Sequence, residues 1–375
     1  MNILISGASI AGPSLALWLA WHGHTVTVVE KAPGLRSGGQ AVDFKGATHR
    51  TVLERMGILD DVLARQTGGA DQTVVDATGK PLATIPGEFT GGDIEIRRGD
   101  LAALLYEHTR NSCEYVFGDS ITSLTDTGGG VHVTFERSAP RTFDLVVGAD
   151  GIHSNVRRLA FGPERDFVHH LGHYYALANL DISGEGLMYN EPGRMVALGG
   201  PKAQSFFVFA SGELSYDRYD AEQQKKLVLD AYRGGGWRVP EVLVAVPAAT
   251  DFFLDSLSRV DMSTYAKGRV VLLGDAAYGN TLGGFGSGLA VVGAYVLAGE
   301  LLRGGHEAAF GRYTELMRGY AKVARKGNAG PFLAPRTRHG IRVRNWLFKR
   351  SVLFGLMMRM TDRFANDIEL PDHIR

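Results

Sequence analysis

The sequence predicts an α/β fold in two parts: a parallel-sheet domain that is discontinuous along the chain, and a second, mainly β domain. Three observations indicate it. They are a strand–turn–helix–strand unit in the first thirty residues, a middle region without that rhythm, and a buried strand that returns near residue 270. The chain has 375 residues, more than one hydrophobic core of ordinary size usually serves, so two lobes are expected.

The N-terminal unit is the clearest local pattern. A short apolar strand, Asn2–Ser6, runs into the turn Gly7–Gly12. The helix that follows has Pro13 in its first turn, and a second strand covers Thr25–Glu30. Because this helix is apolar on nearly every side, it is expected to pack between a sheet and other elements. The pattern predicts a βαβ unit with a buried parallel sheet.

The rest of the chain divides into segments by its pattern of apolar residues. A helix is expected at Asp100–Thr109, after an aspartate N-cap candidate, and a long apolar helix at Leu289–Leu302. Strands are expected at Gln72–Ile85, Glu95–Arg97, Glu114–Phe117, Val131–Phe135, Leu145–Val147, Tyr174–Ile182, Arg194–Leu198, Ser205–Ala210 and Gly268–Gly274. We therefore expect residues 1–72, 98–165 and 259–330 in the first domain, and 73–97 and 166–258 in the second.

The remaining residues, 331–375, are expected to form a C-terminal helical segment. Arg336–Arg359 is basic, contains no acidic residue and interleaves its basic residues with large apolar ones, which predicts an amphipathic helix. We interpret it as a closing helix laid across both lobes with its basic residues in solvent. The alternative is docking to a membrane surface or a partner.

Composition excludes several classes of protein. The 40 Lys and Arg balance the 40 Asp and Glu, so no global charge attracts nucleic acid or anionic lipid. The single cysteine, Cys113, can form neither an internal disulfide nor a cysteine metal cluster. The uncharged stretches are interrupted by Gly and Ser, and the first residues resemble a strand rather than a signal peptide. A cytoplasmic protein without a transmembrane segment, a monomer or weak dimer, is expected.

The first candidate site is the turn Gly7-x-Ser9-x-x-Gly12, which nearly matches the dinucleotide-binding fingerprint. Glycines there permit a tight turn and let helix amides approach a pyrophosphate, although Ser9 adds a side chain at that place. Glu30 ends the second strand, where a carboxylate can accept ribose hydroxyls. The pattern predicts nucleotide binding over a merely structural turn, but it does not distinguish NAD from FAD.

Two later motifs separate these cofactors. In residues 144–157 a buried strand runs into Asp150-Gly151, followed by a Ser-x-x-Arg helix start that ends at Arg157. In residues 268–277 a second buried strand delivers Gly274-Asp275 to a loop and helix. With the N-terminal turn, these segments resemble the signatures of FAD-dependent (group A) aromatic monooxygenases of the p-hydroxybenzoate hydroxylase class, and the compact length is similar to the tetracycline-inactivating members.

The resemblance implies a Rossmann-like FAD-binding domain, a mainly β-sheet substrate domain and roles for individual residues. Glu30 would hold the adenosine ribose and Asp275 the ribityl hydroxyls, while amides around Gly284–Gly288 would face the flavin ring. Asp150 would lie near the pyrophosphate and the approach of the reductant, with Arg157 supporting that loop. The implied FAD-binding residues are Gly7, Ser9, Ile10, Ala11, Gly12, Glu30, Lys31, Arg98, Asp150, Asp275, Gly286 and Gly288.

The chain departs from this resemblance after Asp275. Tyr278 stands where the family usually has histidine, and the loop 279–284 lacks the usual prolines. A Gly-rich loop is expected to be more mobile, which puts the positioning of the flavin ring in question.

The middle region offers candidates for the substrate pocket. We expect the substrate between the second sheet and the Gln40–Lys45 loop, with Phe206 also nearby and ordinary sheet core as the alternative for the phenylalanines. The candidate pocket residues are Gln40, Asp43, Tyr174, Phe207 and Phe209. The His169-His170-x-x-His173 cluster is interpreted as pocket wall and not as a metal site, since adjacent strand residues point to opposite faces.

The implied reaction uses NADPH or NADH and dioxygen to hydroxylate an aromatic small molecule, phenolic, indolic or polyketide-like, through a flavin C4a-hydroperoxide. Such chemistry fits secondary metabolism and antibiotic biosynthesis or modification, and the flavin would carry it without a nameable catalytic side chain. The main alternative is an FAD-dependent reductase or dehydrogenase without oxygen insertion. A nucleotide-binding partner protein without turnover is a third reading, and the four tryptophans do not form the halogenase signature.

Overall fold

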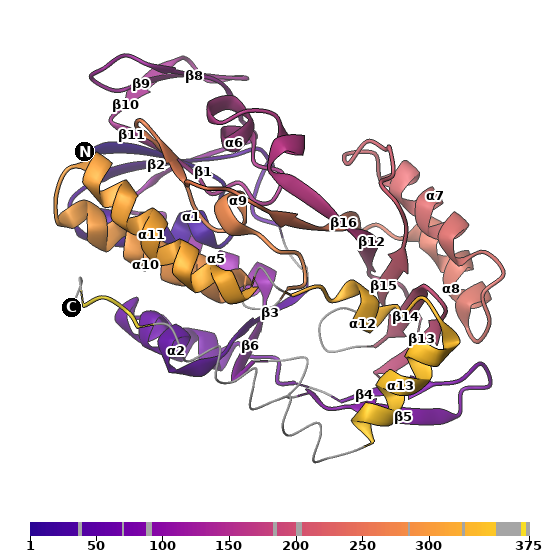
Figure 1. The fold of residues 1–375 in the computed structure, drawn as a ribbon. Coiled ribbons are helices and arrows are strands. Elements are labelled where there is room, and N and C mark those ends of the chain that lie inside the picture. The colour runs from indigo at the N-terminus through magenta and orange to yellow at the C-terminus, as the bar shows by residue number, and fades with distance from the viewer. Residues whose placement is uncertain are drawn as a thin grey trace.

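The computed structural model describes residues 1–36, 40–69, 71–87, 92–182, 186–199, 205–283, 286–324, 327–349 and 369–372. Two large sheets organise these residues, and each forms the centre of one lobe (Figure 1). The α/β fold with a second, mainly β lobe is therefore confirmed.

The first lobe contains a six-stranded sheet, parallel except at one edge. Its order is β17-β18-β11-β1-β2-β7, so three segments far apart in the chain lie side by side. The strands are β1 (Asn2–Ser6), β2 (Thr25–Glu30), β7 (Glu114–Phe117), β11 (Leu145–Gly148), β17 (Ala266–Lys267) and β18 (Val270–Leu272). This lobe is discontinuous because the middle of the chain leaves it and returns at β18.

Helices cover this sheet as the apolar patterns predict. The helix α1 (Ala11–Trp21) packs against α10 (Gly286–Leu302) and α5 (Arg98–Thr109), and the Trp18 and Tyr295 rings meet edge to face at 5.4 Å. The helix α11 (His306–Ala324) lies on α10. Because α1 and α10 are buried on nearly all sides, their sequences carry no polar face.

Smaller elements complete the first lobe. The helices are α2 (Gly46–Arg55), α3 (Leu59–Ala64), α6 (Asn155–Ala160), the 3₁₀ turn η1 (Glu164–Asp166) and α9 (Asp275–Tyr278). The strands are β3 (Ala41–Phe44), β6 (Ile94–Arg97), β8 (Ile121–Asp126), β9 (Val131–Phe135) and β10 (Arg141–Phe143). The strand β6 pairs with β3, and its Ile94 and Ile96 join the first lobe's core, so this end of the 73–97 segment departs from the second lobe in which we expected it.

The second lobe is built on a seven-stranded sheet of order β16-β12-β15-β14-β13-β4-β5. The strands are β4 (Gln72–Val75), β5 (Pro81–Ile85), β12 (Val168–Ala178), β13 (Leu187–Glu191), β14 (Arg194–Leu198), β15 (Ser205–Ala210) and β16 (Phe252–Val260). The strand β12 starts before and ends before the predicted Tyr174–Ile182, because a bulge between His170 and Tyr174 interrupts the alternation there.

The two faces of this sheet meet different partners. One face packs under the helices α7 (Ala221–Tyr232) and α8 (Val239–Ala245), together with η2 (Val246–Ala248). The other face packs against the short helix α12 (Gly330–Leu333) and against Leu282, which comes from the first lobe. Successive residues of each strand alternate between these faces.

The C-terminal helix α13 (Arg338–Phe348) packs on β5 and β13 (Figure 1). The C-terminal segment also contacts the first lobe, where the Tyr295 hydroxyl donates to the Pro371 carbonyl at 2.8 Å, but the described helix α13 lies on the second lobe. The buried Arg344 guanidinium anchors it by donating to the carbonyls of Phe332 and Leu333 and to the Asn190 side chain. Residues 350–359 of the predicted helix lie outside the described residues. No described helix has the length and hydropathy of a membrane span.

Candidate functional site

The turn after β1 is shaped by two glycines. Gly7 has a φ of 109°, and a Cβ there would lie 2.4 Å from the Ala149 carbonyl oxygen at the end of β11. A Cβ on Gly12 would lie 1.9 Å from the Gly7 carbonyl oxygen. Both distances are too short for any other residue, so the backbone itself requires these glycines. Ile10 and Ala11, which begin α1, are buried.

Glu30 closes this turn from the end of β2. Its carboxylate accepts the Ala8 amide at 2.9 Å and the Ala32 amide at 2.8 Å. Lys31 points elsewhere, since its Nζ lies 4.1 Å from the centre of the Tyr219 ring in the second lobe. The structure thus brings Glu30 to the turn, whereas Lys31 contacts the loop that precedes α7.

Arg98, Ser9 and Asp275 come from three different segments and converge beside this turn. The Arg98 Nε donates to the Ser9 Oγ at 3.2 Å. Asp275 follows β18, and a Cβ on Gly286 would lie 3.7 Å from its Oδ1. The Asp275 side chain is exposed, yet surrounding protein raises the pKa of its carboxyl, with the Arg98 charge acting in the opposite direction. A carboxyl that solvent can reach, although protein atoms surround it, lies in a depression of the surface.

The loop after β11 is held from inside by Asp150. The Asp150 carboxylate accepts the Ser154 hydroxyl, the Val156 amide at 3.0 Å and the Ser6 hydroxyl at 3.5 Å. Burial raises the pKa of this carboxyl, and the hydrogen bonds oppose that rise. The buried Arg157 then donates to the Ala276 carbonyl at 2.9 Å, which ties this loop to the start of α9. The two later motifs are thereby joined.

His49 is a site neighbour that the sequence patterns missed. It lies in α2 and packs against the first turn of α10, where a Cβ on Gly288 would come within 2.3 Å of its ring. Burial lowers the pKa of His49 to about 4, although the Lys45 amide and the Asp93 charge act to raise it. A neutral imidazole therefore packs beneath the N-terminus of α10 at ordinary pH, and no local motif marks it.

Tyr278 and the loop after it do not behave as expected from sequence. The Tyr278 ring is buried beside Tyr265, and its hydroxyl donates to the Leu289 carbonyl at 3.3 Å. The loop is bonded to β16, since the Val260 amide donates to the Gly279 carbonyl and the Thr281 amide to the Ser258 carbonyl. Up to residue 283 the Gly-rich loop is an anchored segment, and Tyr278 is a core residue of the first lobe.

Of the residues predicted for a substrate pocket, Gln40 lies beside Arg98 of the converged cluster, and Asp43 lies farther along β3. The Gln40 carbonyl accepts the Arg98 amide at 3.2 Å, and Asp43 stands opposite Glu95 in the β3–β6 pair.

Tyr174, Phe207 and Phe209 lie on the other side of the second sheet, in the core under α7 and α8. The Tyr174 hydroxyl accepts the Leu214 amide at 2.8 Å, and the Phe207 ring lies 5.4 Å from Tyr232. Phe209 also borders a groove of about 840 Å³ between α7, the β13–β14 hairpin and α13. These three side chains therefore lie on the face of the sheet under α7 and α8, and their part in a substrate pocket stays a prediction.

The opposite face presents Tyr175 and Phe206. The Tyr175 ring lies 5.7 Å from Phe253 and 6.5 Å from Phe206, and its hydroxyl experiences the charges of both Arg98 and Asp275. Burial raises the pKa of Tyr175, so this phenol stays neutral. The face of the sheet that turns toward the converged cluster is therefore aromatic and apolar.

The three histidines of β12 have separate partners. His169 lies 3.8 Å from Asp261, His170 contacts the Ser211 carbonyl at 2.9 Å, and His173 contacts the Leu171 carbonyl at 3.4 Å. Within the ranges that the structure describes, no group of three or more His, Cys, Asp or Glu could hold a metal ion.

Known proteins resemble this chain over both lobes. A family described as "FAD binding domain" matches residues 1–309. A flavin-dependent monooxygenase of Legionella longbeachae is 35% identical over 342 residues, 87% of each chain. An uncharacterised protein of Mycobacterium tuberculosis is 40% identical over 341 residues, 86% of this chain and 91% of its own. The crystal structure of the tetracycline destructase Tet(55) matches with a TM-score of 0.82 and 33% identity, covering 99% of this chain and 98% of that one.

Proposed function

Because this chain belongs to the FAD binding domain family and is a flavin-dependent monooxygenase, we propose that it uses NAD(P)H and dioxygen to hydroxylate an aromatic small molecule. Its cofactor is FAD. Phenolic and polycyclic, polyketide-like compounds are the substrate class that we favour.

The single observation that carries the proposal is the convergence of Ser9, Arg98 and Asp275 from three segments. A fixed cation, a hydroxyl and an accessible carboxylate in one depression suit a ligand that carries phosphates and a polyol chain. The turn fits the same ligand, since Gly7 and Gly12 leave it without side chains where a pyrophosphate would approach the start of α1. The residues present therefore fit FAD.

Bound FAD supplies hydride acceptance from NAD(P)H and the activation of dioxygen, and the protein's own residues supply binding and orientation. We assign Glu30 and the Gly7–Gly12 turn to the adenosine half, and Asp275 to the polyol chain. Arg98 would contact the phosphate or polyol portion. The first turn of α10, with Gly286 and Gly288, would present amides to the flavin ring, where a helix N-terminus stabilises negative charge.

The aromatic face of the second sheet is our candidate for the substrate wall. Tyr175, Phe206 and Phe253 would orient a planar substrate over the flavin and exclude water from it. Support for a polycyclic substrate comes from the likeness to Tet(55), whose name assigns it a tetracycline. On this proposal, residues 166–258 form most of the substrate-binding domain.

The sequence feature that favoured a reductase without oxygen insertion no longer supports that alternative. It depended on Tyr278 and a mobile loop beside the flavin, whereas Tyr278 lies in the core and the loop is bonded to β16. We propose that the enzyme acts in the cytoplasm as a monomer or weak dimer, with NADPH or NADH as a transient reductant.

The proposal is tested by the absorbance spectrum of the purified protein and then by an assay of NAD(P)H oxidation and product formation. The purified protein is expected to show flavin absorbance near ~450 nm and to oxidise NADPH or NADH faster when phenols, indoles or a tetracycline are added. A product heavier by one oxygen atom would establish the reaction. Flavin without oxygen insertion for the whole panel would favour the reductase, and absence of flavin after reconstitution would contradict the proposal.

A further inference from the structure

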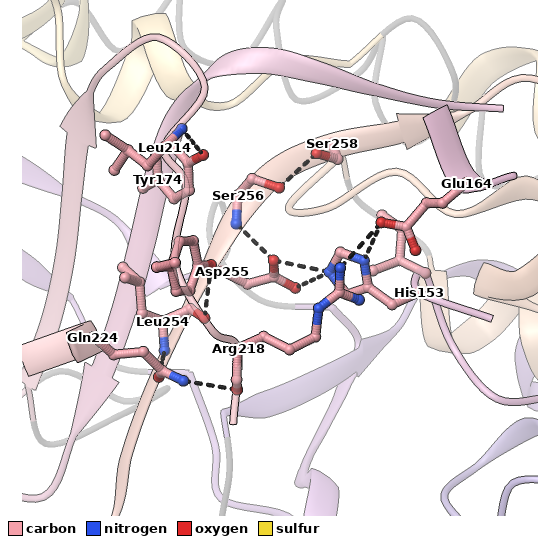
Figure 2. A network of polar contacts seen from close by, with 12 residues as sticks. His153, Glu164, Tyr174, Leu214, Arg218, Gln224, Leu254, Asp255, Ser256 and Ser258 are labelled. Carbon is pink, nitrogen blue, oxygen red and sulfur yellow. Dashed lines mark hydrogen bonds and ion pairs between the residues drawn. The ribbon is translucent and has the colours of Figure 1, made fainter. Parts of the chain in front are cut away.

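A cluster of four charged side chains joins the two lobes away from the converged cofactor residues. His153 and Glu164 come from the first lobe, whereas Asp255 comes from β16 and Arg218 from the loop before α7 (Figure 2). His153 Nε2 lies 3.0 Å from the Asp255 Oδ1. His153 Nδ1 and the Arg218 Nη2 both reach the Glu164 Oε1, at 3.0 and 3.2 Å. Each lobe thus contributes one cation and one anion.

We propose that His153 is a positioning residue, which holds strand β16 of the second lobe, and through Glu164 and Arg218 the 211–220 loop, against the first-lobe loop that Asp150 organises. His153 stands two residues after Gly151 and one before Ser154, which bonds Asp150. A displacement of His153 therefore displaces the loop that Asp150 organises. This inference rests on the proposed function for its kinetic consequence only.

In the second lobe, Asp255 lies on β16, which pairs with β12, the strand that carries Tyr175 of the aromatic face. It stands opposite Tyr175 in the β12–β16 register and also accepts the Ser256 amide at 2.7 Å. The same strand is bonded to the loop after Asp275 through Ser258 and Val260. The His153–Asp255 contact thus connects the loop that Asp150 organises to the strand that pairs with the candidate substrate wall.

The contact depends on a protonated imidazole, because both ring nitrogens face carboxylates and each must donate. Burial alone lowers the pKa of His153, but the hydrogen bonds that it donates to Asp255 and Glu164 raise it to about 9. Burial would raise the pKa of Glu164, yet His153 and Arg218 lower it to about 2. Tyr174 and Tyr216 beside Asp255 have raised pKa values and stay neutral, and Arg157 adds a positive charge near Glu164.

The pH dependence follows from these directions. His153 has a folded pKa above its ordinary value of 6.5, so its contribution is complete below that pH and is lost as the pH rises through about 9. Glu164 has a folded pKa below 4.5, so its contribution is present above that pH and is lost as the pH falls toward about 2. The charged bridge therefore operates across the neutral range.

The experiment compares His153→Gln with a matched control in the FAD-loaded enzyme. His108→Gln removes a histidine–aspartate pair with a 3.2 Å contact to Asp61 that lies wholly within the first lobe. Hydrogen exchange at neutral pH is expected to increase in peptides from 211–220 and 252–260 for His153→Gln alone. The KM for NAD(P)H is expected to rise about fivefold or more with little change in FAD content. His153→Lys, which keeps a positive donor, is expected to recover part of both effects.

The melting temperature gives a readout independent of activity. The difference between wild type and His153→Gln is expected to be constant between about pH 4.5 and 6.5 and to vanish above about pH 9. If His153→Gln does not fold, Asp255→Asn replaces it, since the amide keeps one acceptor and removes the charge. Equal exchange and pH profiles for the His153 and His108 variants would overturn the proposal. An enzyme without oxygen insertion would contradict the proposed function only.

Discussion

The two lobes form their parts of the site in different ways. In the first lobe the backbone itself shapes the site, because Gly7 and Gly12 let the turn close on Ala149 without any side chain between them. In the second lobe the sheet contributes through side-chain direction, since Tyr174 packs under α7 while Tyr175 turns toward Arg98 and Asp275. A site formed by the backbone is therefore disturbed by any side chain added at its glycines, whereas a site formed by one face of a sheet tolerates substitutions on the opposite face.

The largest effect is expected from a methyl group in the Gly7–Gly12 turn. Gly12→Ala places its Cβ 1.9 Å from the Gly7 carbonyl oxygen, so β1 and α1 must separate. We expect a loss of roughly 3 kcal/mol in the free energy of unfolding, with most of the FAD lost. Thermal unfolding and the absorbance of the purified protein measure both.

The matched control is Gly319→Ala in the exposed part of α11, where nothing lies within 4 Å of an added Cβ. It is expected to leave FAD bound and to stabilise the protein by about 0.5–1 kcal/mol. A Gly12→Ala protein as stable as this control, with full FAD, would show that the turn has room that the structure denies it.

A smaller effect is expected from Asp275→Ala, which leaves the backbone intact and removes one accessible carboxylate. Hydrogen bonds to a charged group are worth about 1.5–3 kcal/mol, so FAD affinity should fall about 10- to 100-fold. Equilibrium titration of the reconstituted apoprotein measures it. Asp275→Asn should lose less, and Asp60→Ala on α3 should lose nothing. Full flavin occupancy with normal turnover in Asp275→Ala would contradict the role assigned to this residue.

The smallest and sharpest test separates the two faces of the second sheet. Tyr174→Phe removes the acceptor of the Leu214 amide, so it is expected to cost about 1 kcal/mol of stability and to leave the KM for the aromatic substrate unchanged. Tyr175→Phe is expected to change that KM about two- to fivefold and to leave stability unchanged. Unfolding curves and substrate titrations on both variants measure this, and the reverse pattern would return the substrate wall to the face under α7.

Elements with a local cause were predicted well. The β1–α1–β2 unit has the bounds that its apolar pattern indicates, because a short strand, a glycine turn and a buried helix each leave a local mark. The seven-stranded sheet was predicted in outline, but the start of β12 was misplaced, since its bulge between His170 and Tyr174 breaks the alternation, and the strand ends at Ala178, before the predicted Ile182. The strand β6 was given to the wrong lobe because its apolar alternation does not say which strand it pairs with.

The α/β class, the parallel unit and the motif residues Gly7, Gly12, Glu30, Asp150 and Asp275 could be recognised from the sequence alone. These follow from glycine geometry and from the period of apolar residues, which act over a few positions along the chain. Three features emerge only in the folded chain: Tyr175, not Tyr174, turns toward Arg98, Tyr278 is buried in the core, and His153 meets Asp255 across the lobes. Such outcomes depend on strand register and on contacts between residues about a hundred positions apart, for which no local pattern carries a signal.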